Sequence, residues 1–274
     1  MTVAVGLAAA VSLAGAPMAA AATVSSAGHP TRGIDISAYQ HAKGPINWRL
    51  LDRQGIRFVA IKVTEGTYYT NPYYRSDARA AARAGLAVMP YVFANPHAAS
   101  GAATASFAVR AARYGRDGAK LPLVVDLEND PYSSSNCYRL GARRMIAWIA
   151  GFTARTRALT GQWPIIYTTD AWWGQCTRST RRFSADPLWL ADYNAGWPRA
   201  PGAWDRSAFW QYSGEGFLRG IGWTDLDYFR PVTDLASLRP AARPKHKPKP
   251  KSKHKPKPKP KHKPKSKRKK TAVR

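Results

Sequence analysis

The sequence contains few cysteines and few acids. Only Cys137 and Cys176 are cysteines, and 16 Asp and Glu stand against 43 Lys and Arg in 274 residues. Two cysteines cannot complete a four-ligand zinc site, and no histidine pair at ligand spacing lies near them. The chain also lacks a nucleophile elbow, a P-loop and a Gly-x-Gly-x-x-Gly motif after an expected strand. These absences argue against serine-hydrolase, nucleotide-binding and structural zinc sites.

Lysine is almost missing from the first 239 residues, where it occurs only as Lys43, Lys62 and Lys120. Residues 240–274 contain 17 Lys and Arg and no acid, so they carry most of the formal net charge of +27. Their Lys-Pro repeats cannot form a core, because proline removes backbone donors and like charges repel. We therefore expect 240–274 to be a disordered, Lys/Pro-rich basic tail.

The other end of the chain is apolar. Residues 1–22 are rich in alanine and end in three consecutive alanines, which is typical of a signal peptide with a small-residue cleavage site. A membrane anchor is the alternative, but the run is short for a spanning helix and no later segment is apolar enough to span. We expect a linker over 23–31 and a secreted protein, extracellular or associated with a cell wall. In such a protein Cys137 and Cys176 are expected to form a disulfide, with a reactive thiol as the alternative.

Between these ends, 32–239 alternates short apolar runs with helical patterns. Expected strands are 33–37, 58–63, 86–93, 123–127, 163–168, 188–192, 209–212 and 225–229. Expected helices are 46–54, 73–84, 100–114 and 138–159, and only loops are expected between the strands after 168. Strands that alternate with helices of this length favour parallel βαβ units. We predict an α/β fold, an irregular TIM-like (β/α) barrel of eight strands with fewer helices in its second half; an open doubly wound sheet is the alternative.

Two carboxylates stand at the end of the apolar run 123–127. Asp126 and Glu128 point to the same side of a strand and should raise each other's pKa, an arrangement suited to one protonated and one charged acid. A strand that simply ends in solvent is the alternative. Barrel enzymes place their active sites at the C-terminal ends of the strands. Seven of the 16 acids fall at such positions: Asp35, Glu65, Asp126, Glu128, Asp192, Asp225 and Asp227.

Aromatic and amide side chains accompany these acids. The expected strand ends and their loops also carry Tyr91, Tyr167, Trp173 and Gln211. Flat apolar rings that stack on sugars, together with acids that protonate a glycosidic oxygen, are what a glycan-cleaving cleft needs. A divalent cation bound by the acids is the alternative, and each aromatic residue alone is equally typical of core packing. We predict a glycan site without a metal or cofactor.

Several ordered motifs resemble glycoside hydrolase family 25 lysozymes. They are 33–37 (GIDIS) with Gln40, 58–66 (FVAIKVTEG), 84–93 (AGLAVMPYVF), 123–128 (LVVDLE), 164–167 (PIIY), 188–191 (LWLA), 210–212 (WQY) and 220–229 (GIGWTDLDYF). The resemblance covers 32 to about 231. The spacing of the two cysteines, with YTTDAWW at 167–173 between them, is similar to that of secreted actinobacterial-type members.

This resemblance implies a muramidase with an irregular barrel, which would hydrolyse the β-1,4 bond between N-acetylmuramic acid and N-acetylglucosamine in peptidoglycan. Glu128 matches the family's proposed general acid, and Asp126 matches the partner that orients the substrate's acetamido group as an internal nucleophile. Asp35 and Asp225 match the acids of the first and last strands. The expected substrate-binding residues are Tyr91, Tyr167, Glu65, Asp192, Gln211, Trp173 and Asp227, although relatives often have Asn at the last position.

Two other functions remain open from the sequence: hydrolysis of another N-acetylated glycan such as chitin, and a cell-wall-binding module without catalysis. The expected partners are peptidoglycan glycan strands and, through the basic tail, anionic wall polymers. The tail's charge would also attract nucleic acid, but export makes such binding incidental and no specific nucleic-acid partner is expected. No membrane span is expected once the signal peptide is removed.

Overall fold

The computed structural model describes residues 30–114, 120–194, 196–202, 204–230 and 238. The expected signal peptide, the basic tail and all but the end of the linker lie outside these residues. The chain separates into one compact unit, Met1–Ala242, and a second, Arg243–Arg274.

Fifteen elements make up the described fold. In chain order they are β1 (Thr31–Ile36), η1 (Ala38–Lys43), α1 (Trp48–Arg53), β2 (Phe58–Glu65), β3 (Tyr69–Thr70), α2 (Tyr74–Arg83), β4 (Ala87–Phe93), α3 (Gly101–Ala111), β5 (Val124–Asp126), α4 (Ala142–Thr160), β6 (Ile165–Thr168), α5 (Asp170–Thr177), β7 (Leu188–Ala191), β8 (Phe209–Leu218) and β9 (Gly222–Phe229).

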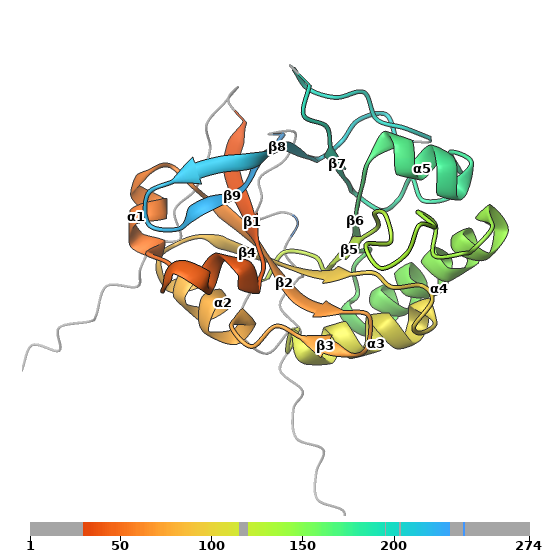
Figure 1. Ribbon diagram of the computed structural model, residues 1–274, viewed down its shortest axis with the longest axis horizontal. Helices are drawn as coiled ribbons and strands as arrows, with labels where there is room; N and C mark the ends of the chain where they lie inside the picture. The colour runs from red at the N-terminus through yellow and green to blue at the C-terminus, as the bar shows by residue number, and fades with distance from the viewer. Residues whose placement is uncertain (1–29, 115–119, 195, 203, 231–237, 239–274) are drawn as a thin grey trace, which may run out of the picture. The chain divides into compact units, whose positions relative to one another are not determined.

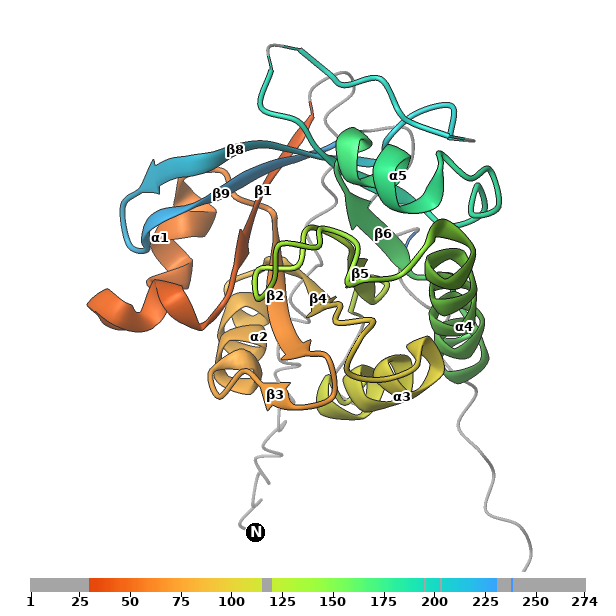
Figure 2. The same cartoon turned by 45° about the vertical axis from the view of Figure 1, so that its right-hand side comes forward.

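The sheet closes on itself. Strand order is β1-β9-β8-β7-β6-β5-β4-β2, with β1 also paired to β2 and the short β3 added at the edge of β2. Eight strands therefore form a barrel, and in Figures 1 and 2 they form a ring with α2, α3 and α4 on its outside. The predicted irregular barrel is confirmed, and the open sheet is wrong.

Alternation along the strands separates two environments. Phe58, Met89, Ile165 and Phe209 point into the barrel and form its interior core. Val59, Val88 and Ile166, each one residue away from an inward side chain, point outward, where they pack under the helices in two further clusters. On β1 the inward position at Gly33 has no room for a side chain, because an added Cβ would lie 2.2 Å from the Phe58 ring.

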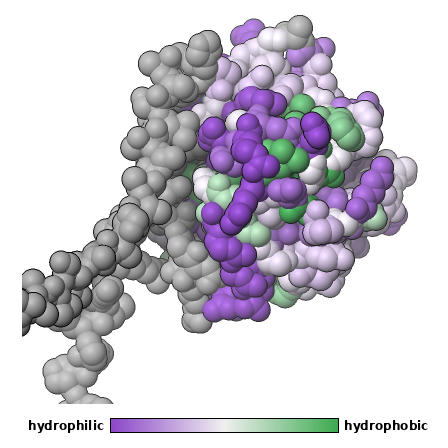
Figure 3. Space-filling model, turned by 90° about the vertical axis from the view of Figure 1, so that its left-hand side faces the viewer, coloured by the Kyte–Doolittle hydropathy of each residue, from purple (hydrophilic) through white to green (hydrophobic). Residues whose placement is uncertain are grey.

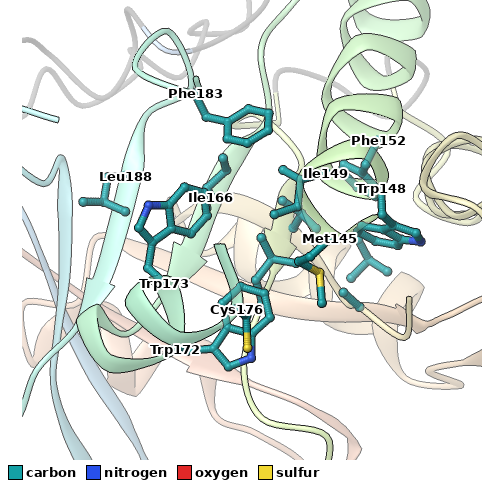
Figure 4. Close-up of a cluster of buried hydrophobic side chains, with 14 of the residues drawn as sticks. Met145, Trp148, Ile149, Phe152, Ile166, Trp172, Trp173, Cys176, Phe183 and Leu188 are labelled. Atoms are coloured by element: carbon teal, nitrogen blue, oxygen red, sulfur yellow. The ribbon is translucent and has the colours of Figure 1, made fainter. Parts of the chain in front are cut away.

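One outer cluster joins β5, β6 and β7 to α3, α4 and α5. It contains Met145, Ile149, Phe152 and Trp173, all fully buried, and Figure 4 shows these side chains packed together. The Cys137–Cys176 disulfide ties the loop before α4 to α5, which confirms the expected pairing. The cluster fixes the segment that follows β5, where the acids lie.

The last two strands depart from the parallel pattern. β8 and β9 form an antiparallel hairpin, and β9 is antiparallel to β1 as well. The hairpin exposes Phe217 and Trp223, which lie edge to face with ring centroids 5.6 Å apart. Figure 3 presents the side of the molecule on which the hairpin lies, where hydrophobic side chains form a small patch among hydrophilic ones.

Two helix predictions were wrong. The helix expected at 138–159 begins only at Ala142, because Tyr138 and Arg139 adopt left-handed backbone angles. A short helix, α5, occupies Asp170–Thr177 where only a loop was expected. It is capped by Thr169, whose side chain accepts a hydrogen bond from the backbone N–H of Trp172. Its Trp-Trp-Gly core contains weak helix formers, which is why a loop was expected there.

No helix within the described residues combines the length and the apolar character needed to cross a membrane.

Candidate active site

The C-terminal ends of the parallel strands bring most of the predicted acids to one rim of the barrel. Asp126 is the last residue of β5 and pairs in register with Phe93 of β4 and Tyr167 of β6. Glu128 follows two residues later, so both side chains face the barrel axis. We call Asp126 and Glu128 the acid pair. Asp126 is buried and Glu128 is half-buried.

Burial raises the pKa of both members of the acid pair. Burial, then the charge of Glu128, raises the pKa of Asp126 well above its usual value. Burial also raises the pKa of Glu128, while a hydrogen bond with Asp126 and the charge of Lys62 lower it. The pKa of Glu128 is thus raised as expected, but Asp126 opposes that rise instead of causing it. Because the two acids interact strongly, the pair titrates as one unit, and it retains a proton to higher pH than an isolated carboxyl group.

A second carboxyl group cluster lies on β1 and β9. Asp35 and Asp225 are direct partners across this antiparallel pair, and Asp227 lies two residues further along β9. Burial, then the charges of Asp227 and Asp225, raises the pKa of Asp35 well above its usual value. Burial likewise raises the pKa values of Asp225 and Asp227.

Gln211 of β8 organises this cluster. Its Nε2 donates to Asp35 Oδ2 at 2.7 Å, while its Oε1 accepts from the hydroxyls of Tyr167 and Tyr193, both at 2.8 Å. Asp227 Oδ1 accepts from Trp189 Nε1 at 2.9 Å, below the rim inside the barrel. Through Gln211, the buried Asp35 carboxyl group of β1 and the Tyr167 hydroxyl of β6 belong to one hydrogen-bond network.

Tyr91 of β4 lies among the acids. Burial, followed by the charges of Asp35, Asp126, Asp225 and Glu128 in that order, raises its pKa well above the usual value. Tyr91 points into the barrel and pairs in register with Val124 of β5, the strand that ends at Asp126, so its hydroxyl lies within electrostatic range of the acid pair and of the β1–β9 cluster. Its neutral O–H is kept as a hydrogen-bond donor.

Lys62 and two tyrosines around Glu65 were missed by the sequence reasoning. Lys62 Nζ lies 2.7 Å from Glu65 Oε2, and Glu65 Oε1 accepts from the hydroxyls of Tyr68 (2.8 Å) and Tyr132. Burial raises the pKa of Glu65, but the hydrogen bonds from Lys62, Tyr132 and Tyr68 outweigh it, so the net pKa is lowered. The sequence did contain a signal for Lys62. It is one of only three lysines before the basic tail, and it lies in the apolar run of β2 at a position that alternation points into the barrel.

Two expected substrate-binding residues do not join the network. Trp173 is fully buried in α5, where it packs against Phe183 and Trp204 and donates from Nε1 to the carbonyl of Thr180. The structure therefore does not bring its ring to the rim. The Asp192 carboxylate instead binds the backbone N–H and side-chain amide of Asn194, within the loop after β7.

The arrangement supports acid–base chemistry on a polar substrate. The acid pair can release a proton and then take one up, and the β1–β9 cluster, Tyr91 and Tyr167 surround it with donors and acceptors. Exposed rings near the rim, on Tyr68, Tyr132 and Tyr193, offer flat faces for sugars. Within the described ranges, no group of three or more His, Cys, Asp or Glu side chains has an arrangement that could hold a metal ion.

Comparison with known proteins identifies the family. Residues 34–221 match the sequence model described as Glycosyl hydrolases family 25. Lysozyme M1 of Streptomyces globisporus is 38% identical over 192 residues, covering 69% of this chain and 64% of its own length. An N,O-diacetylmuramidase of Chalaropsis sp is 39% identical over 188 residues, covering 66% of this chain and 87% of the relative.

A solved structure of the same family is also similar to this chain. The family GH25 lysozyme from Aspergillus fumigatus superposes with a TM-score of 0.70 at 34% identity, covering 78% of this chain and all of that one. The predicted resemblance and the glycoside hydrolase class are confirmed. This chain belongs to glycosyl hydrolases family 25.

Proposed function

We propose that this protein is a secreted muramidase that hydrolyses the β-1,4 bond from N-acetylmuramic acid to N-acetylglucosamine in peptidoglycan. The observation that carries the proposal is the acid pair, a buried and a half-buried carboxyl group two residues apart at the end of β5, which retain a proton through burial and mutual interaction. The names of the relatives, lysozyme and N,O-diacetylmuramidase, agree with this substrate.

Glu128 is the general acid in the proposed mechanism, and Asp126 binds the acetamido N–H of the muramic acid. Such a hydrogen bond stabilises the charged form of Asp126 and lowers its pKa. The proton that the free pair shares is then held by Glu128. Substrate binding thereby sets the protonation state that catalysis needs.

The bond changes follow from these roles. The acetamido carbonyl oxygen attacks the anomeric carbon as the glycosidic bond breaks, and Glu128 gives its proton to the leaving O4 of N-acetylglucosamine. A bicyclic oxazolinium ion remains on the muramic acid, and its N–H stays hydrogen-bonded to the Asp126 carboxylate. The Glu128 carboxylate next takes a proton from a water molecule, whose oxygen attacks the anomeric carbon and reopens the ring with net retention.

The other acids and the tyrosines have supporting roles in the proposal. Asp35 and Asp225 hold polar groups of the sugar opposite the acid pair, with Tyr91, Tyr167 and Gln211 as hydrogen-bonding partners. Glu65, fixed by Lys62, and Asp227, bound to Trp189, stabilise the surroundings of the acids. Each of these roles predicts reduced cleavage in the corresponding variant, with the fold retained.

One assay separates this proposal from the other functions. Purified protein is incubated with cell walls and with chitin, and new reducing ends are identified by sugar. Muramic acid ends that disappear with Glu128→Gln support the proposal; chitin cleavage alone indicates a different glycan, and binding without cleavage indicates a wall-binding module. Undiminished cleavage by Glu128→Gln would contradict the role of Glu128.

We propose further that residues 240–274 attach the enzyme to anionic wall polymers. The support is the sequence: 17 positive charges without an acid in 35 residues attract polyanions through long-range electrostatics. Deletion of 241–274 should reduce wall binding at low salt and leave cleavage of short soluble glycans unchanged. Wall binding that is equal with and without the tail at low salt would rule the attachment out.

A further inference from the structure

The β8–β9 hairpin continues past the end of the barrel. The ladder between β1 and β9 ends at the pair Asp35 and Asp225, and the ladder between β7 and β8 ends at Gln211. Beyond these residues, the described parts of β8 and β9 pair only with each other, up to Leu218 opposite Gly222. The hairpin therefore projects beyond the rim that carries the acids.

The two faces of the projecting hairpin differ. Leu218 belongs to the buried cluster under α1, so it marks the outer face. Its neighbour Phe217 points the opposite way and lies directly opposite Trp223 in the ladder, so the two rings share the inner face. Trp223 is also two residues from Asp225, and side chains two residues apart in a strand share a face. The rings of Phe217 and Trp223, which we call the aromatic pair, thus lie on the face that carries Asp225.

The aromatic pair is exposed, although the hairpin that carries it is anchored. The Phe217 and Trp223 side chains are 62% and 61% exposed. The carbonyl of Gly220, at the turn, accepts from the backbone N–H of Asn47 at 2.8 Å. In Figures 1 and 2 the tip of the hairpin accordingly lies beside α1. A surface that is held in place before binding loses little conformational freedom when a ligand stacks on it.

Gly214 lies on β8 between the rim and the aromatic pair, and it has no side chain. A Cβ added to Gly214 would lie 3.3 Å from Tyr193 Oη and 3.7 Å from Asp225 Oδ1. Glycine at this position therefore leaves the space beside both groups open to a ligand that extends from the rim to the hairpin.

The spacing and size of the aromatic pair fit a sugar. Two residues of a strand span about 6.5 Å, which is comparable with the length of one pyranose residue in a β-1,4-linked strand. The two rings have an interplanar angle of 72°, so a sugar can stack on one ring while its edge meets the other. Each ring can bury at most ~150–250 Å², far less than the ~800 Å² per partner of a stable protein interface.

We propose that the aromatic pair is a sugar-binding subsite, which extends the glycan cleft beyond Asp225 and makes the enzyme prefer long glycan strands. The inference rests on the proposed muramidase function, because the ligand is the same strand that the acid pair cleaves. A sugar stacked on the aromatic pair lies one residue beyond the sugar at Asp225, away from the bond that breaks. Its binding stabilises the bound substrate and the transition state equally, so it lowers KM and leaves kcat unchanged.

The test measures KM and kcat on peptide-free peptidoglycan fragments of defined length, from the disaccharide to the octasaccharide. Trp223→Ala removes one ring, Trp223→Phe retains a flat ring, and Phe217→Ala removes the other ring. Arg219→Ala is the matched control. Arg219 is exposed at the turn of the same hairpin and has no ring, and its carbonyl, which accepts from Gln54 Nε2 at 2.8 Å, is kept in the variant.

We expect the KM of the unmodified protein to fall as the fragments lengthen. Trp223→Ala should raise KM on the octasaccharide about 3- to 10-fold, as for one lost aromatic contact, with kcat nearly unchanged. On the shortest fragments that are cleaved, which do not reach the hairpin, its KM should be that of the unmodified protein. Phe217→Ala should act in the same direction, Trp223→Phe should restore part of the loss, and Arg219→Ala should match the unmodified protein at every length.

Equal KM values for Trp223→Ala and the unmodified protein on the octasaccharide would overturn the subsite. A rise of the same size at every length, or the same rise in Arg219→Ala, would also overturn it, because the hairpin fold and not the rings would then be responsible. Failure of the muramidase proposal looks different, since the unmodified protein would then release no muramic acid ends from fragments of any length. Unfolding midpoints of the variants should be unchanged, because both rings are exposed.

Discussion

Asp35 of β1 and Asp225 of β9 are direct cross-strand partners, although 189 residues separate them in the sequence. Like charges in directly opposed positions of an antiparallel pair are destabilising. Burial, together with this cost, raises the pKa of both groups, while a hydrogen bond from Gln211 stabilises the charged form of Asp35. The pair therefore destabilises the fold more as it loses its protons.

Asp225→Asn should make the thermal stability of the protein less sensitive to rising pH. The folded-state pKa values of Asp35 and Asp225 are raised, so their contribution to stability is complete below the unfolded pKa of about 4 and is lost as pH rises through the folded values. The variant removes one charge and lowers the pKa of Asp35. Thermal midpoints between pH 4 and 8 should fall less than in the unmodified protein.

Glu215→Gln is the matched control, because Glu215 is an exposed acid on neighbouring β8. Its midpoints should follow those of the unmodified protein at every pH. If Asp225→Asn shows the same decline as this control, the opposed pair is not a source of the pH dependence.

Lys62→Met should move the pH profile of cleavage upward. The Lys62 ammonium lowers the pKa of both members of the acid pair, and it lies over the Phe93 ring at 4.6 Å from the centroid. Without that charge both macroscopic pKa values of the pair rise, so the acidic and alkaline limbs of kcat/KM shift to higher pH.

Lys62→Arg keeps the positive charge, so the limbs of its pH profile should stay near their original positions. Lys43→Met is the matched control, because Lys43 is an exposed lysine on η1, and its pH profile should be that of the unmodified protein. A profile for Lys62→Met that loses height without shifting would mean that Lys62 supports the fold of the site and does not tune its protonation.

Asp186→Asn should stabilise the protein above neutral pH. Burial raises the pKa of Asp186 to about 7 in the folded state, so this group's contribution to stability is complete below about pH 4 and is lost as pH rises through 7. At 1.36 kcal/mol per pKa unit, the loss reaches roughly 4 kcal/mol at alkaline pH. Urea unfolding at pH 5 and pH 8.5 should show a gain that grows with pH, while the exposed-acid variant Asp205→Asn shows none.

Gly33→Ala should be strongly destabilising. The added Cβ would lie 2.2 to 2.4 Å from atoms of the Phe58 ring, which is fully buried inside the barrel. We expect a loss of at least about 3 kcal/mol in urea unfolding, as for severe overpacking. Gly141→Ala is the control, because nothing lies within 4 Å of its added Cβ, and it should change stability by less than about 1 kcal/mol. Equal costs for the two variants would refute the packing argument.

Local patterns in the sequence were sufficient for much of the fold. Apolar alternation placed the strands, and glycines such as Gly161, in the left-handed conformation after α4, marked where helices end. The same patterns failed where a distant contact decided the structure. The helix expected from Tyr138 is interrupted because the disulfide and Ser135 hold the segment in another conformation, and α5 forms through its cap and buried tryptophans despite weak propensity.

The sequence by itself determined the identity of the acids, their positions at strand ends and the shared side of Asp126 and Glu128, because these follow from the two-residue period of a strand. Only the tertiary structure decided which acids meet, since barrel closure pairs Asp35 with Asp225 across an antiparallel register that no local pattern encodes. It also decided protonation. Burial raises the pKa of both members of the acid pair, and the charge of Lys62, which comes from β2, lowers both.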